Sequence, residues 1–165
     1  MAVFSLTSAT ILCGVAWTGT APGDPGTQTV SGTVSSSTNI STMVSEIEIG
    51  VAAEELEYTN FGSGGWKQKI GSGLKDGSVR LTFNQDFAAS TVDSLFGLGG
   101  TFAFGAAGGF YIDVKPTSAA RGVTNPSHVA QVLNVNYTPL SGAAGALVTM
   151  NLTFPSTGQI ARLTS

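Results

Sequence analysis

The sequence predicts a mostly β protein: an antiparallel β-sandwich or barrel of two packed sheets, with one short flanking α-helix and long loops. Short segments alternate apolar and polar residues with the period of two that a half-buried strand requires. Glycine and proline separate these segments. The chain has 165 residues, the size of one domain, and it contains no internal repeat. We therefore expect a single β-sandwich domain over residues 1–165.

The strand pattern is clearest over residues 146–154, where four apolar residues oppose Thr149, Asn151 and Thr153. A tight turn over 155–158 then predicts that a last strand pairs with this one as a hairpin. Residues 51–59 suit either a short helix or a continuation of the strand before them. Strands are expected at residues 7–19, 40–49, 78–83, 101–104, 110–115, 127–137, 146–154 and 159–164.

Three other segments lack the strand pattern. Residues 20–39 contain two prolines and no apolar periodicity, which predicts a long flexible loop. Residues 60–77 contain six glycines together with Trp66, which predicts a loop that exposes a large aromatic side chain. Apolar residues at roughly helical spacing predict a short helix over Asp86–Leu98 that ends at two glycines. The residues on its packing face are Phe87, Val92, Leu95 and Phe96.

The composition is unusual for a free soluble domain, because only 10% of the residues are charged while 42% are hydrophobic. This suits either a subunit buried in an assembly or a secreted β-sandwich. The net charge of −3 argues against nucleic-acid binding through a basic patch. The charge is also uneven, since no lysine or arginine precedes Lys67. It reflects either solvated loops or a subunit with one acidic and one basic surface, suited to head-to-tail contact.

The sequence offers no convincing active site. His128 and Cys13 are the only histidine and the only cysteine, so we expect no metal site built on these residue types, no cofactor and no enzyme activity. Glu46 and Glu48 are predicted to lie about 6.5–7 Å apart on one strand face, which is more typical of a solvated face than of a glycosidase pair.

The N-terminus has no basic segment that would indicate a secretory signal. The uncharged segment 95–112 contains six glycines, which argues against a membrane span.

From Glu55 onward, several segments occur together in a suggestive order. They are Glu-Leu-Glu-Tyr-Thr-Asn-Phe-Gly at 55–62, the run from Gly73 to Phe87, and the segments 124–127, 137–142 and 154–160. Over about two thirds of the chain, they resemble the tail tube (major tail) proteins of siphophages, the long-tailed bacteriophages. The first 39 residues match poorly.

The resemblance implies a structural subunit with two packed antiparallel sheets and a flanking helix. Six copies would close into a ring, in which edge strands pair between neighbours to form a continuous inner barrel. Rings would stack through loops, and the lumen would conduct DNA during ejection without binding it specifically. The implied partners are further copies of this chain and the tape measure, tail terminator and distal tail proteins, with no membrane. The implied location is the virion tail, assembled in the cytoplasm of the host bacterium.

The resemblance also implies roles for particular residues. The loop Gly62–Lys75 is similar to the element that stacks rings, with Trp66 as its apolar anchor and Lys67 and Lys69 contacting acids of the next ring. The helix is expected to pack on the outer side. Polar strand residues are candidates for the lumen, although alternation alone does not tell the lumen face from the outer face. These candidates are Glu46, Glu48, Thr149, Asn151 and Thr153.

Three alternatives remain at this point. The first is a secreted or surface β-sandwich that binds a ligand, such as an adhesin. The second is the tube protein of a contractile injection system, which shares the fold that the resemblance implies. The third is a hydrolytic enzyme on a jelly-roll fold, which the shortage of histidine disfavours.

Overall fold

The computed structural model describes residues 8–22, 29–59, 62, 64–71, 74–88, 90–141 and 143–165. The predicted fold class is confirmed, because antiparallel strands dominate and one short helix accompanies them. The elements are β1 (Thr10–Gly14), β2 (Ala16–Thr18), β3 (Thr33–Ser35), β4 (Thr38–Asn39), β5 (Val44–Ala53), β6 (Leu56–Glu57), β7 (Lys69–Ile70), β8 (Lys75–Asn84), α1 (Val92–Phe96), β9 (Phe110–Lys115), β10 (Ser127–Val132), β11 (Thr149–Pro155) and β12 (Ala161–Leu163).

The strands form two main sheets that enclose one core. A five-stranded antiparallel sheet has the order β12-β10-β9-β1-β4, and a three-stranded antiparallel sheet has the order β11-β8-β5. Two small hairpins, β2–β3 and β6–β7, complete the strands. The inward side chains of both main sheets belong to the same buried cluster. The arrangement therefore matches a β-sandwich, in which each sheet buries one face.

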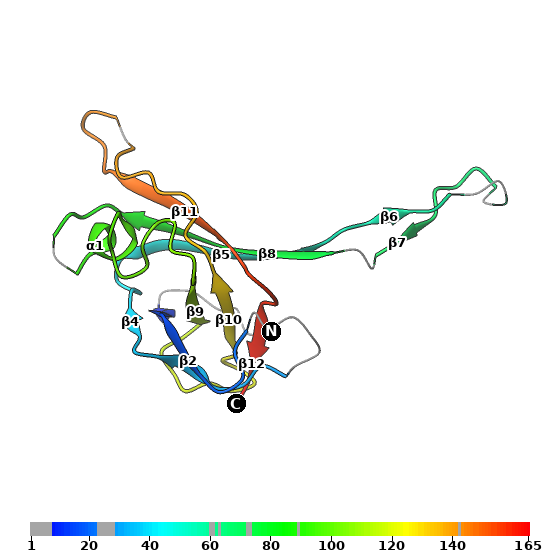
Figure 1. The fold of residues 1–165 in the computed structure, drawn as a ribbon, viewed down its shortest axis with the longest axis horizontal. Helices are drawn as coiled ribbons and strands as arrows, with labels where there is room; N and C mark the ends of the chain where they lie inside the picture. Colours follow the sequence, from blue (N-terminus) through cyan, green and yellow to red (C-terminus); the bar gives the residue numbers. More distant parts are fainter. Residues whose placement is uncertain are drawn as a thin grey trace.

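Strands β5 and β8 extend beyond β11, the third strand of their sheet. They remain paired from Val44–Phe83 out to Ala53–Lys75, and β6 pairs with β7 farther out. We call the described residues of 51–77 the arm, a two-stranded ribbon that projects far from the body (Figure 1). At its base, a Cβ on Gly77 would lie only 2.9 Å from both Ile160 Cδ1 and Ser156 Oγ. A larger residue at position 77 would therefore require the Ile160 and Ser156 side chains to shift where the turn before β12 packs against the arm.

The core is centred on the aromatic ring of Phe96, the last residue of α1. Its ring centroid lies 5.2–5.9 Å from the rings of four other phenylalanines, and its side chain is completely buried. These four rings come from β8, the turn after α1, β9 and β11, so Phe96 connects both sheets. The Asn134 side chain is also buried, and its Nδ2 donates hydrogen bonds to the carbonyls of Phe96 and Phe102. The four partner phenylalanines are Phe83, Phe102, Phe110 and Phe154.

A second internal contact joins Asp113 on β9 to Arg121 in the turn before β10. Arg121 Nη2 donates a 3.0 Å hydrogen bond to Asp113 Oδ2, and Ser127 Oγ donates to the other carboxylate oxygen. Arg121 Nη1 donates to the carbonyls of Gly32 and Ser165. The Asp113 side chain is only 3% exposed, so this ion pair is largely withdrawn from water. Arg121 thereby ties the β2–β3 connection and the chain end to the five-stranded sheet.

Two predicted elements differ from the structure near α1. The helix spans only Val92–Phe96 instead of Asp86–Leu98. In the residues before it, side chains form hydrogen bonds with the backbone. The Asp86 carboxylate accepts from the Ala88 N–H, and the Thr91 hydroxyl donates to the Asp86 carbonyl, so a local turn replaces helical hydrogen bonds. Residues 101–104 form turns instead of a strand, although Phe102 is buried.

The predicted last hairpin is wrong, because β12 pairs with β10 and not with β11. After Pro155, the chain crosses from one sheet to the other, and Ser156 N donates to the Gly77 carbonyl at the crossing.

Residues 51–59 continue the preceding strand, with β5 reaching Ala53 and β6 following. Of the predicted loop over 20–39, residues 33–35 and 38–39 form β3 and β4, and residues 23–28 lie outside the described residues. No described helix has both the length and the hydropathy to cross a membrane.

Candidate assembly surfaces

The polar residues predicted on the strands lie together on one face of the three-stranded sheet. Glu46 and Glu48 come from β5, and Thr149, Asn151 and Thr153 come from β11. All five are exposed, whereas the residues that alternate with them on β11 are completely or almost completely buried. The sheet therefore has one core face and one polar face. The two faces arise because successive side chains of a strand point to opposite sides of the sheet.

Strand register places these polar residues in rows across the sheet. Glu48, Arg80 and Thr153 form one row, with Arg80 Nη1 3.8 Å from Glu48 Oε2. The next row joins Glu46 and Asn151 through Thr82, whose hydroxyl lies 2.6 Å from Asn151 Oδ1 and 3.4 Å from Glu46 Oε2. The face thus carries hydroxyls, an amide and carboxylates, and its single guanidinium among these rows is already beside a carboxylate.

Both outer strands of this sheet have an open edge. Strand β5 is terminal in the sheet order, and no strand in the described part of the chain pairs with its outer side. Strand β11 is terminal on the other side, where Leu133 N donates a 3.0 Å hydrogen bond to the Pro155 carbonyl at the strand end. A long, open edge offers unpaired N–H and C=O groups to another strand, which natural proteins usually cover or blunt.

The residues predicted for stacking all lie on the arm, and the structure pairs two of the lysines within the chain. Lys67 Nζ is 3.0 Å from Glu57 Oε2, and Lys69 forms an ion pair with Glu55. Both pairs are exposed, so each stabilises the ribbon by only about 0–1 kcal/mol. Lys75 begins β8 opposite Ala53. These contacts gather charge on one face of the outer arm.

The opposite face of the outer arm is apolar. Leu56 pairs with Ile70 across the ribbon, and directly opposite residues in an antiparallel pair share a face. The ladder continues outward through Tyr58 N, which donates to the Gln68 carbonyl at 3.0 Å, so Tyr58 shares the face of Leu56. Leu56, Tyr58 and Ile70 are exposed, and Trp66 beyond them is 81% exposed. The sequence prediction included Trp66 but missed this face, because it depends on the pairing of two strands.

The segments around α1 lie at the end of the molecule opposite the arm (Figure 1), and several of their apolar side chains are exposed. We call the described residues of 85–100 and 133–148 the α1 end. Their segments are joined by hydrogen bonds from Gln85 to the carbonyls of Pro139 and Val148, and by one from the Tyr137 hydroxyl to Asp93. Val92, Leu95 and Phe96 are buried, whereas Phe87 is 59% exposed. The exposed apolar side chains of the α1 end are Phe87, Leu98, Val135, Leu140 and Leu147.

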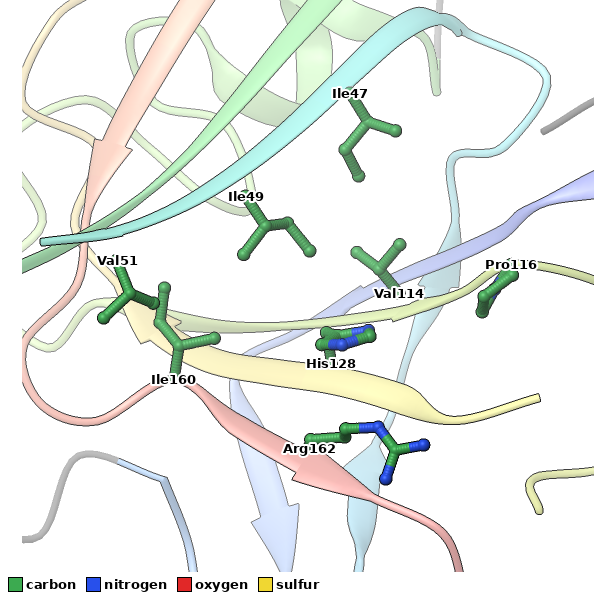
Figure 2. A pocket seen from close by; sticks show the side chains of 8 residues that line it. All are labelled: Ile47, Ile49, Val51, Val114, Pro116, His128, Ile160 and Arg162. Atoms are coloured by element: carbon green, nitrogen blue, oxygen red, sulfur yellow. The ribbon is translucent and has the colours of Figure 1, made fainter. Parts of the chain in front are cut away.

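A groove opens between the two sheets beside β5 and β12. Its volume is about 440 Å³, and Figure 2 shows Ile47, Ile49 and Ile160 pointing into it. His128 and Arg162 face the groove from directly opposite positions on β10 and β12. Desolvation and, secondarily, the charge of Arg162 lower the pKa of His128 below its usual value near 6.5. The groove is therefore an apolar recess with Arg162 as the cation at its rim.

The lowered pKa of His128 predicts a pH dependence of stability. The folded chain disfavours the protonated imidazole, so it binds fewer protons than the unfolded chain below about pH 6.5. We expect the free energy of unfolding to fall as the pH is lowered from 7 to 5, and His128→Gln to make this fall shallower. Urea titrations at several pH values measure it. An identical slope in the variant would contradict the expectation.

No protein-family model and no curated protein matches this sequence. Among solved structures, the chain is similar to a chain in the tail of an empty gene transfer agent particle with C6 symmetry. That match has a TM-score of 0.44 and 14% identity, and covers 74% of this chain and 83% of the other. It is also similar to a chain in the virion of a native gene transfer agent particle, with a TM-score of 0.43, 14% identity, and 73% and 84% of the two chains covered.

Proposed function

We propose that this chain is a self-assembling structural subunit of a phage-like tail tube, in which hexameric rings stack around a lumen that conducts DNA. The observation that carries the proposal is the three-stranded sheet, which combines a polar face with open edges on both sides. A sheet of this kind satisfies its edges when copies join side by side into a closed ring. The resemblance of residues from Glu55 onward to siphophage tail tube proteins supports the same arrangement.

The polar face of the sheet suits the wall of a DNA-conducting lumen. Glu46 and Glu48 outnumber the single cation beside them, Arg80, and the remaining residues of the rows are neutral. A neutral or acidic surface gives phosphates no cation to bind, so DNA can slide along it. We propose that this face lines the lumen. The core face and the five-stranded sheet then lie on the outer side of the ring.

The proposed function predicts that the purified protein assembles without any partner. We expect negative-stain electron microscopy to show hollow tubes or rings with six-fold class averages, and sedimentation to show a mass that grows with protein concentration. The physical reason is that each copy carries unpaired strand edges that only a neighbour covers. A monodisperse monomer at high concentration, across a range of salt concentrations, would contradict the proposal and favour the ligand-binding β-sandwich.

A further inference from the structure

We propose that the groove beside β5 binds a single-chain anionic amphiphile, namely a medium-chain fatty acid in free solution. The aliphatic tail fills the apolar recess, and the carboxylate bonds the guanidinium of Arg162. The inference goes beyond the proposed function, because it assigns a small-molecule ligand to a surface of the single subunit. Three observations carry it: an uncovered apolar recess, a cation at its rim without a carboxylate partner, and a described lining without acidic side chains.

The recess is apolar on both sides. Ile47, Ile49 and Val51 line one side from alternate positions of β5. Val114 of β9 and Ile160, which precedes β12, line the other side (Figure 2). The volume of about 440 Å³ lies within the usual range for small-molecule sites, about 300–1,000 Å³. From Ile47 to Val51, β5 advances by four residues, about 13 Å, which suits an extended alkyl chain.

Nothing in the described chain closes the recess beside β5. No described strand pairs with the outer side of β5, so Ile47 and Ile49 are only half-buried and Val51 is 62% exposed. Burial of one methylene group in an apolar site raises an affinity about fourfold. An alkyl tail therefore binds more tightly with each carbon that the recess accommodates.

Arg162 supplies an available cation at the rim of this recess. Its side chain is exposed and forms no ion pair with the residues that the structure describes. Its Nη2 donates a 3.3 Å hydrogen bond to the Val123 carbonyl, which leaves other N–H groups of the guanidinium for a ligand. A carboxylate matches the planar guanidinium with two parallel hydrogen bonds.

The surroundings of Arg162 favour an anion. His128 lies directly opposite it on β10, and desolvation and the charge of Arg162 lower the pKa of His128, so the neutral imidazole can donate one N–H at neutral pH. The other charged group that acts on His128 is Asp113, whose carboxylate is buried and bonded within the chain. No described residue of the lining is acidic, and Glu46 and Glu48 lie on the opposite face of β5.

An elongated apolar recess with one free cation at its rim matches a ligand that has one aliphatic tail and one anionic head. A small inorganic anion would leave the recess empty, and an uncharged lipid would leave Arg162 without a partner. A medium-chain fatty acid uses both features. This complementarity of shape and charge selects the ligand class.

Calorimetric titration of the purified protein with octanoate, decanoate and dodecanoate tests the inference. We expect binding below the micelle concentration of each acid, with an affinity that rises about fourfold per methylene group until the tail outgrows the recess. Acetate has the head without the tail, and decanol has the tail without the head, so both should bind far more weakly than decanoate. Equal binding of decanol and decanoate would indicate unspecific partitioning and overturn the proposal.

Arg162→Gln removes the cation and should weaken decanoate binding about 10- to 100-fold, the usual effect of losing hydrogen bonds to a charged group. Arg80→Gln is the matched control, because Arg80 is an exposed arginine on the polar face of the three-stranded sheet. This control should bind decanoate as the parent does, and thermal unfolding checks that both variants fold. Equal weakening in the two variants, or none in either, would contradict the role of Arg162.

His128 gives an independent readout, because it is the only histidine of the chain and its imidazole signals in nuclear magnetic resonance are unambiguous. A carboxylate bound at Arg162 favours the protonated imidazole, so saturating decanoate should raise the pKa of His128. Decanol should leave that pKa unchanged. An unchanged pKa in the presence of bound decanoate would mean that the head lies elsewhere.

The outcomes separate this inference from the proposed function. A parent that forms tubes but binds no decanoate would overturn the inference and leave the proposed function standing, whereas a permanent monomer that binds decanoate would do the reverse. If Arg162→Gln changes the size of the assemblies while decanoate does not bind, a second copy occupies the recess and the fatty acid assignment is wrong.

Discussion

Replacing Phe96 by alanine is expected to lower the free energy of unfolding by about 3–5 kcal/mol, the range for removing a large aromatic side chain from a core. The ring is completely buried and contacts four other phenylalanines from both sheets and the turn after α1. Its removal leaves a cavity that these rings cannot easily fill, because three of them are held on separate strands and the fourth in a turn. At roughly 2–4 °C per kcal/mol for a chain of this size, the melting temperature should fall by about 10 °C. Thermal unfolding followed by circular dichroism measures it.

Phe87→Ala is the matched control for this prediction. Both phenylalanines belong to the packing face predicted from the sequence, but Phe87 is 59% exposed and precedes the helix. Its removal should change the free energy of unfolding by no more than about 0.5 kcal/mol, as is usual at the surface. Equal losses in the two variants would show that the core does not centre on Phe96.

Arg121→Met is expected to lower the free energy of unfolding by about 3–5 kcal/mol, because it leaves the Asp113 carboxylate buried without its cation. The two side chains are 16% and 3% exposed, so water cannot replace the lost partner. The substitution also removes the donors that Arg121 Nη1 gives to the carbonyls of Gly32 and Ser165. Chemical denaturation of the variant at neutral pH measures the loss.

Two further variants check this second prediction. Arg80→Met breaks the exposed contact with Glu48 and should cost only about 0–1 kcal/mol. Adding Asp113→Asn to Arg121→Met removes the buried charge, so the double variant should recover part of the lost stability. A double variant less stable than Arg121→Met would mean that the Arg121 charge is not what stabilises Asp113.

Much of the fold could be predicted because one face of each main sheet is buried. Strands β8, β9 and β11 alternate strictly enough that their core faces follow from the sequence. The five polar residues named as lumen candidates are all exposed, and the strand register places them on one face of the sheet. Their assignment to a lumen stays a prediction, since alternation separates buried from exposed and not inner from outer.

The errors in the fold have two causes, strand pairing across the chain and side-chain hydrogen bonds in a local turn. The partner of β12 depends on the crossing after Pro155, which local turn residues do not reveal. The ion pairs of Lys67 and Lys69 depend on the register of the arm and could not be read from the sequence, while the contact of these lysines with a neighbouring ring stays a prediction. The helix was predicted too long because Asp86 and Thr91 favour a local turn over helical hydrogen bonds.

Strands β5 and β8 continue from the body into the ribbon, and this continuity fixes where the ribbon tip stands. Paired strands twist with a fixed hand, so the orientation of the ribbon tip relative to its own sheet depends on the number of residue pairs between them. Lengthening each strand by two residues would move the tip outward by about 6.6–6.8 Å and rotate it further. Ribbon length thereby sets both how far the tip stands from its own sheet and the direction in which it points.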